Sequence, residues 1–176
     1  SPPEFLKMVC EHGVSLVSLI PTMLAGMMEA PNVSDAFRAV RTIVYGAAPI
    51  SEALLRKVIK RCPDVNLVQI YGQTECTGPC LILPPERHTL TGPLAGKLQT
   101  AGRANMVSEV RIADANGQPV EPGIAGEILI RGASVMLGYW QQPDITRQTL
   151  RDGWLHTGDV GVMDEEGFVC IADRLK

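Results

Sequence analysis

The stretch VNLVQIYGQTE, residues 65–75, decides the fold that the sequence predicts. Its first part, VNLVQI, is mostly apolar and rich in β-branched residues, which is typical of a buried strand. The second part, YGQTE, places an aromatic ring, a hydroxyl and a carboxylate directly after that strand. Because open α/β sheets bind ligands just beyond the carboxyl ends of their strands, this order predicts a ligand site at residues 71–75.

Helical and strand-like segments alternate on the N-terminal side of this stretch. Apolar residues at helical spacing, a good N-cap at Ser51 and stops at proline and glycine define the segments. Such alternation is typical of parallel α/β structure. We expect helices at residues 2–12, 21–30 and 52–62, and strands at residues 14–20 and 41–46.

The pattern changes after Leu83, where prolines and glycines cluster. Residues 109–114 and 126–132 read as strands, with Asn116-Gly117 as a tight turn between them. Residues 160–164 and 168–174 read as a second hairpin. We therefore expect a parallel α/β sheet layer in residues 1–90 and a small, antiparallel, distorted β-barrel in residues 91–176.

Composition narrows the function classes. The chain has 176 residues, of which 45% are hydrophobic, so it can bury a core. A net charge of -3 carries no footprint of a nucleic-acid or anionic-membrane partner. No apolar run approaches the roughly 18 residues of a membrane-spanning helix. Five cysteines without a C-x-x-C pair indicate neither a disulfide framework nor a zinc ribbon, so we expect a reduced, cytoplasmic protein.

Two interpretations of YGQTE remain open on the residues alone. In the first, Thr74 caps a following helix and Glu75 favours its positive end. In the second, the Thr74 hydroxyl and backbone amides face a phosphate, Glu75 holds Mg²⁺ and Tyr71 lies flat against a base. The first interpretation is the commoner use of such residues.

Three other segments have a similar pair of interpretations. WLHTGD, residues 154–159, places Asp159 after a glycine in a turn between strands, where it either bonds local amides or accepts from ribose hydroxyls. Arg174 is either solvated or contacts ribose or phosphate. GAAP, residues 46–49, suits either a tight turn or a backbone close to a flat ligand.

The residues give little support to a metal site, a reactive cysteine pair or a serine hydrolase. The three histidines stand without a carboxylate or cysteine at ligand spacing, which argues against a metal site built on them. Cys76 and Cys80 are better explained by core packing. The sequence has no G-x-S-x-G elbow, which argues against a hydrolase of that type.

Taken in order, IPTML, VYGAAPIS, QIYGQTE, the segment from AGEILIRG through YWQQPDITRQTLRDGWLHTGD to FVCIADR, and the final LK resemble the adenylate-forming enzymes. This superfamily comprises acyl-CoA synthetases, aryl-CoA ligases, luciferases and peptide-synthetase adenylation domains. The resemblance runs over essentially the whole chain, and the ordered series of motifs is specific.

The resemblance implies that ATP and a carboxylic acid form an acyl-adenylate, and that a thiol, usually of coenzyme A, then takes the acyl group. Mg²⁺ would accompany the ATP. The implied nucleotide contacts are Gly46, Ala47 and Ala48 at the adenine, Tyr71 stacked on it, Gly72 and Gln73 near the nucleotide and acyl carboxylate, Thr74 at the α-phosphate, Glu75 at the magnesium, Asp159 and Arg174 at the ribose, and Ile171 nearby.

The resemblance also implies what surrounds the chain. Lys176 falls where the family has its interdomain hinge, the family's phosphate loop would lie upstream, and its catalytic lysine would lie in a C-terminal domain. We therefore expect this chain to be part of a longer enzyme, and to make no acyl-CoA by itself.

Within the family, the MLGYW and PDITRQTLRDGW segments resemble the fatty acyl-CoA synthetases most. The acyl-binding candidates Gly72, Cys76, Thr77 and Gly78 are small and uncharged. The alternatives are an aryl-CoA ligase, an amino-acid adenylation domain, and a non-catalytic nucleotide-binding or interaction domain that has kept the fold. Retention of four nucleotide contacts, Thr74, Glu75, Asp159 and Arg174, weighs against the last.

Overall fold

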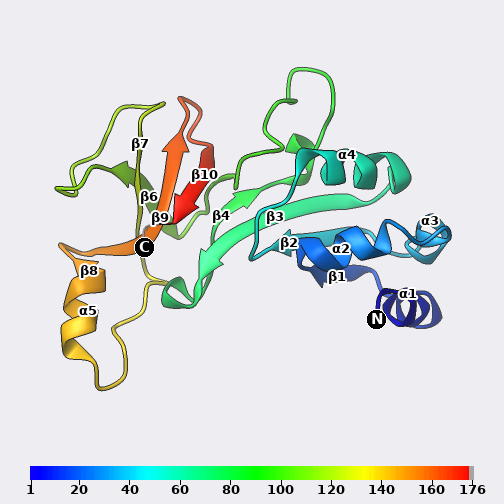
Figure 1. Ribbon diagram of the computed structural model, residues 1–176, viewed down its shortest axis with the longest axis horizontal. Helices are drawn as coiled ribbons and strands as arrows, with labels where there is room; N and C mark the ends of the chain where they lie inside the picture. The colour runs from blue at the N-terminus through cyan, green and yellow to red at the C-terminus, as the bar shows by residue number, and fades with distance from the viewer. Residues whose placement is uncertain (175–176) are drawn as a thin grey trace. The chain divides into compact units, whose positions relative to one another are not determined.

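A computed structural model describes residues 1–174 (Figure 1). The chain divides into two compact units. Unit 1 comprises Ser1–Gln69 and Leu83–Gln99, and unit 2 comprises Ile70–Ile82 and the segment from Thr100 onward. The division into subdomains 1–90 and 91–176 stays a prediction from the sequence.

Unit 1 contains the expected alternation of helices and strands, in the blue to cyan part of Figure 1. Strands β1 and β2 pair in parallel, with Leu16 opposite Thr42. The Ser51 hydroxyl accepts from Leu54 N at 3.3 Å, as its N-cap position predicts. The short helix α3 was not expected. The elements are α1 (Pro2–Glu11), β1 (Leu16–Leu19), α2 (Pro21–Met27), α3 (Val33–Ala36), β2 (Thr42–Gly46) and α4 (Glu52–Arg61).

The first sheet has the strand order β1-β2-β3-β4-β5, with β3 at Asn66–Gln73, β4 at Gly78–Leu83 and β5 at Arg103–Ala104. Strand β3 runs three residues beyond the VNLVQI stretch, and β4 is a strand that the sequence did not predict. The close pairing of β3 and β4 depends on Gly72, where a Cβ atom would lie only 2.0 Å from the Gly78 carbonyl oxygen. A missing side chain therefore allows a close backbone approach where the sequence suggests a turn.

Unit 2 also holds the second sheet, whose order is β10-β9-β7-β6, with β8 paired to β9. All of its pairings are antiparallel. The expected C-terminal hairpin is present, with Val169 opposite Met163, and β9 and β10 lie side by side in Figure 1. Helix α5 was not expected. The elements are the 3₁₀ turn η1 (Thr74–Cys76), β6 (Ser108–Ala113), β7 (Ala125–Gly132), α5 (Pro143–Thr149), β8 (Leu150–Arg151), β9 (Trp154–Met163) and β10 (Val169–Arg174). A second 3₁₀ turn, η2 (Pro85–Arg87), belongs to unit 1.

Each unit has its own apolar core. The core of unit 1 gathers residues such as Leu24, Ile43 and Leu55, and that of unit 2 gathers Ile128, Leu155 and others. Both parts of the expected fold, the parallel α/β layer and the antiparallel β structure, are thus confirmed. Among residues 1–174, every helix is too short or too polar to cross a lipid bilayer.

A buried polar cluster fixes the segment after β4 within unit 1. The Tyr45 hydroxyl lies 2.8 Å from His88 Nε2 and 3.2 Å from Gln69 Oε1. His88 Nδ1 lies 3.0 Å from the Pro84 carbonyl, which can only accept, so Nδ1 carries the proton of the neutral ring. Burial lowers the pKa of His88 to about 4.

This burial predicts a pH dependence of stability. His88 has a pKa of about 4 in the folded chain against an ordinary 6.5, so below pH 6.5 the unfolded chain binds a proton that the folded chain does not. The free energy of unfolding should therefore fall as the pH drops from 6.5 toward 4, by up to about 3 kcal/mol from this group.

Urea unfolding at several pH values measures the effect. His88→Gln should flatten this part of the pH dependence, whereas His12→Gln, a change at an exposed histidine, should leave it in place. Equal pH profiles for the wild type and His88→Gln would contradict the assignment.

Candidate active site

The WLHTGD motif lies inside strand β9, not in a turn between strands as the sequence suggested. The register of β9 against β7 shifts here: Glu127 pairs with Val160, but Leu129 pairs with His156. The extra residues form a bulge around Gly158, whose φ of 72° is costly for other residues. Bulges of this kind re-aim side chains beside functional sites, and this one sets the direction of the strand at Asp159.

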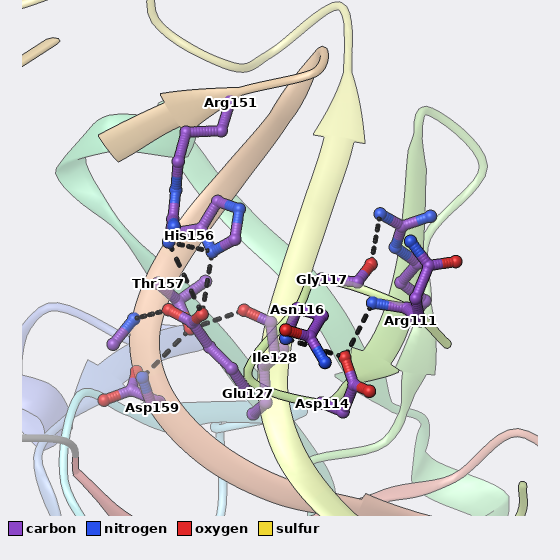
Figure 2. Close-up of polar contacts among 12 residues, drawn as sticks. Arg111, Asp114, Asn116, Gly117, Glu127, Ile128, Arg151, His156, Thr157 and Asp159 are labelled. Atoms are coloured by element: carbon purple, nitrogen blue, oxygen red, sulfur yellow. Dashed lines mark hydrogen bonds and ion pairs between the residues drawn. The ribbon is translucent and has the colours of Figure 1, made fainter. Parts of the chain in front are cut away.

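Side-chain hydrogen bonds hold the bulge in place (Figure 2). The Thr157 hydroxyl donates to the Ile128 carbonyl at 2.7 Å and accepts from Asp159 N at 3.1 Å. The Glu127 carboxylate accepts from Gly158 N at 3.0 Å. The bulge therefore depends on two polar side chains, one on each strand.

Glu127 also holds His156. Its Oε2 lies 2.7 Å from His156 Nδ1, and because a carboxylate only accepts, Nδ1 donates. Arg151 lies 2.6 Å from the same Nδ1 and 4.0 Å from Glu127 Oε2. A protonated ring nitrogen cannot accept a hydrogen bond from a guanidinium. Arg151 therefore contributes its positive charge, which attracts the Glu127 carboxylate. Glu127 is 29 residues from His156 along the chain, so no ligand spacing in the sequence indicated this pair.

Tyr71 and Asp159, two residues singled out by separate motifs, meet directly. The Tyr71 hydroxyl donates to Asp159 Oδ2 at 2.7 Å, although 88 residues separate them. Burial, and then this hydrogen bond, raise the pKa of Tyr71. Gln73 Nε2 adds a longer contact of 3.5 Å to the Thr157 carbonyl. The end of β3 is thereby joined to the β9 bulge.

A 3₁₀ turn at Thr74–Cys76 follows β3 in place of an α-helix. Gln73 holds the cap position that the first interpretation gave to Thr74, and Thr74 itself is exposed. Cys76 and Cys80 are buried in the core of unit 2, as expected. Thr77, with a φ of 57°, is exposed next to them.

Glu75 is held at two points by the segment before α5. Met136 N donates to the Glu75 carbonyl at 2.7 Å, and the Tyr139 hydroxyl donates to Glu75 Oε1 at 2.6 Å. The hydrogen bond to Glu75 raises the pKa of Tyr139. Tyr139 is a site residue that the sequence motifs did not predict. A signal was present, since a tyrosine between glycine and tryptophan in an otherwise irregular segment is a candidate contact.

The surroundings of Glu75 suit a divalent cation that arrives with a phosphate. Within residues 1–174, its Oε2 makes no hydrogen bond, and no group of three or more His, Cys, Asp or Glu residues gathers to hold a metal. Mg²⁺ commonly uses one or two carboxylates together with substrate phosphates and water. The donor set therefore fits Mg²⁺ carried by a nucleotide.

The remaining candidate residues lie on β2, on the segment that follows it, and on or after β10. Gly46, Ala47 and Ala48 belong to unit 1, where Gly46 ends β2 and Ala47 has a φ of 64°, so their place at an adenine stays a prediction. Ile171 lies on β10, and the backbone of Arg174 pairs with Asp159. The side chain of Arg174 and the expected hinge at Lys176 lie outside the described residues.

Comparisons with known proteins agree with these motifs. Residues 1–140 match the family described as AMP-binding enzyme. A fatty acid–[acyl-carrier-protein] ligase, ScoC of Streptomyces coeruleorubidus, is 38% identical over 98% of this chain and 33% of its own. A feruloyl-CoA synthase of an Amycolatopsis species is 36% identical over 99% of this chain and 34% of its own.

Among solved structures, the amide bond synthetase McbA from Marinactinospora thermotolerans matches with a TM-score of 0.90 and 33% identity, over 100% of this chain and 35% of that one. The chain thus spans about a third of the length of the relatives it matches. The resemblance drawn from the sequence motifs is confirmed. Because residues 1–140 match the family's model, the chain belongs to the AMP-binding enzyme family.

Proposed function

We propose that the intact protein containing this chain is an AMP-forming acid–thiol ligase. In the first step, an oxygen of the acid's carboxylate bonds to the α-phosphorus of ATP while the bond to pyrophosphate breaks. In the second step, the thiol sulfur of coenzyme A attacks the acyl carbon and AMP leaves. The observation that carries the proposal is the hydrogen bond between Tyr71 and Asp159, which joins two motifs of the family in one place.

The proposed roles follow the chemistry of each group. The Tyr71 ring stacks on adenine while its hydroxyl steadies Asp159, and the other oxygen of Asp159 accepts from ribose hydroxyls. Thr74 is exposed at the start of the turn and binds the α-phosphate. Further proposed contacts are Gly46, Ala47, Ala48, Ile171 and Arg174 for the nucleotide, Gly72 and Gln73 for nucleotide and acyl carboxylate, Cys76, Thr77 and Gly78 for the acyl group, and Lys176 for the hinge.

This division of labour needs no protein nucleophile. Attack on the α-phosphorus requires alignment of the two reactants and cancellation of negative charge as it develops. Glu75 would hold Mg²⁺, which when bound neutralises phosphate charge. The protein residues bind and orient, and the turn at Thr74–Cys76 supplies both the phosphate contact and the carboxylate.

A fatty or related carboxylic acid is the proposed substrate class. Gly72 and Thr77, the exposed members of the acyl candidates, are small and carry no charge. The name of ScoC, a fatty acid ligase, supports this class, and that of the feruloyl-CoA synthase supports an aromatic acid as the second candidate. Pyrophosphate release by the intact protein across acids of different length and ring content separates the two.

Coenzyme A is the proposed acyl acceptor. The names of two relatives refer to an acyl-carrier protein and to amide bond synthesis. An acyl-carrier protein and an amine are therefore the alternative acceptors to assay beside coenzyme A. The cytoplasm is the proposed compartment, because all five cysteines, which lie within the described residues, are free thiols.

Glu75→Gln tests the proposed metal contact. An amide keeps the shape of the side chain but loses the charge that a divalent cation requires, so pyrophosphate release should fall by about a hundredfold or more while the protein stays folded. Glu121→Gln, a change at an exposed position of unit 2, is the control and should have wild-type activity. Wild-type rates in Glu75→Gln would mean that magnesium is held elsewhere.

Glu127→Ala tests the support of the bulge. Without the carboxylate, Gly158 N and His156 lose their acceptor, so Asp159 is held less well and the KM for ATP should rise on the order of tenfold. Glu127→Gln keeps an acceptor for Gly158 N and should retain most of the affinity. If both variants bind ATP as the wild type does, Glu127 has no part in positioning Asp159.

A further inference from the structure

The Glu75 carboxylate is itself held by a second side chain, that of Tyr139. We propose that Tyr139 is a positioning residue, which acts through Glu75 by fixing one carboxylate oxygen so that the other faces the metal carried by the nucleotide. The inference rests on the proposed function, because it assigns Glu75 to that metal. Tyr139 is not among the residues that the sequence motifs assign to the site.

The first observation is the geometry at Glu75. The Tyr139 hydroxyl donates to Oε1 at 2.6 Å, a short distance typical of a hydrogen bond to an ionised acceptor. Met136 N donates to the Glu75 carbonyl at 2.7 Å, so the same segment holds both the backbone and the side chain of Glu75. Within the described part of the chain, Oε2 remains without a hydrogen bond.

The second observation is that Tyr139 is itself held. Its backbone N–H donates to the Thr146 hydroxyl at 2.9 Å, and this hydroxyl donates to the Gln142 carbonyl at 2.8 Å. Gly138 packs so closely against Thr146 that a Cβ atom would lie 2.8 Å from its methyl carbon. Helix α5 therefore fixes the backbone from which the tyrosine reaches Glu75.

Neighbouring side chains do not share this arrangement. Leu137 and Trp140, on the same segment, are fully or almost fully exposed at 101% and 87%. Tyr139 is the residue of this Leu137–Trp140 run that turns its polar end to a site carboxylate. Trp140 is therefore a matched position for a control change.

The consequence for chemistry is a carboxylate with little freedom to rotate. A phenol can donate one hydrogen bond, so it occupies one oxygen and leaves the second available. Site groups whose rotamers are fixed by a supporting hydrogen bond bind metal better than free ones, and loss of such a partner typically costs 10- to 100-fold in affinity.

Tyr139→Phe in the intact protein tests the proposal, because it removes a single oxygen atom. Binding of Mn²⁺ to the protein with a non-hydrolysable ATP analogue, followed by electron paramagnetic resonance, should weaken about tenfold. The Mg²⁺ concentration for half-maximal pyrophosphate release should rise similarly, with the KM for the acid unchanged. Trp140→Phe should leave both quantities at wild-type values.

Thr146→Val provides a second, indirect variant. It removes the acceptor of Tyr139 N but keeps the phenol, so we expect a smaller weakening of Mn²⁺ binding in the same direction. In a Glu75→Gln background, Tyr139→Phe should have no further effect on Mn²⁺ binding, since the group through which it acts is gone.

The outcomes separate this proposal from the proposed function. Wild-type Mn²⁺ binding in Tyr139→Phe, together with its loss in Glu75→Gln, would overturn the role of Tyr139 and leave the metal assignment standing. Wild-type Mn²⁺ binding in Glu75→Gln would overturn the assignment of the metal to Glu75, and the role of Tyr139 with it. A general drop in turnover at unchanged metal affinity would mean that Tyr139 is only structural.

Discussion

The hydrogen bond from the Tyr71 hydroxyl to the Asp159 carboxylate is the contact on which the candidate site depends. It joins the end of β3 to the bulge of β9, two segments that the chain keeps far apart. Directly before Asp159, the backbone at Gly158 adopts a left-handed conformation within the bulge, which displaces the strand locally. Glu127 and Thr157 then bond the displaced backbone, so an irregularity of one strand becomes a fixed feature of unit 2.

Local signals predicted those parts of the fold that depend on nearby residues. The cap at Ser51 and the C-terminal hairpin follow from residues adjacent in sequence, and both are present. Strand β4 was missed because glycine and proline at its start are typical of loops. Its strand conformation depends on Gly72, which lies on another segment and has no side chain to prevent the approach. Such tertiary contacts override local propensity.

The candidate site likewise contains residues that local sequence signals predict and residues that only tertiary contacts bring together. Sequence motifs selected Tyr71, Glu75 and Asp159, because each lies in a short stretch, YGQTE or WLHTGD, that combines acidic, aromatic, hydroxyl and glycine residues. Glu127 and Tyr139 did not stand out, since their partners are distant along the chain and only the strand register and the course of the loop bring them close. Glu127 carried one hint, a charged residue directly before the buried apolar run 128–130 of β7.

The two carboxylates proposed to meet the nucleotide each accept a hydrogen bond from a tyrosine hydroxyl of the same chain. Their side chains have therefore lost rotational freedom when the chain folds, before any substrate arrives. Part of the entropy loss that normally opposes association is then absent from the binding step. A site arranged in this way can discriminate by shape from the first encounter, because the nucleotide must match a geometry that already exists.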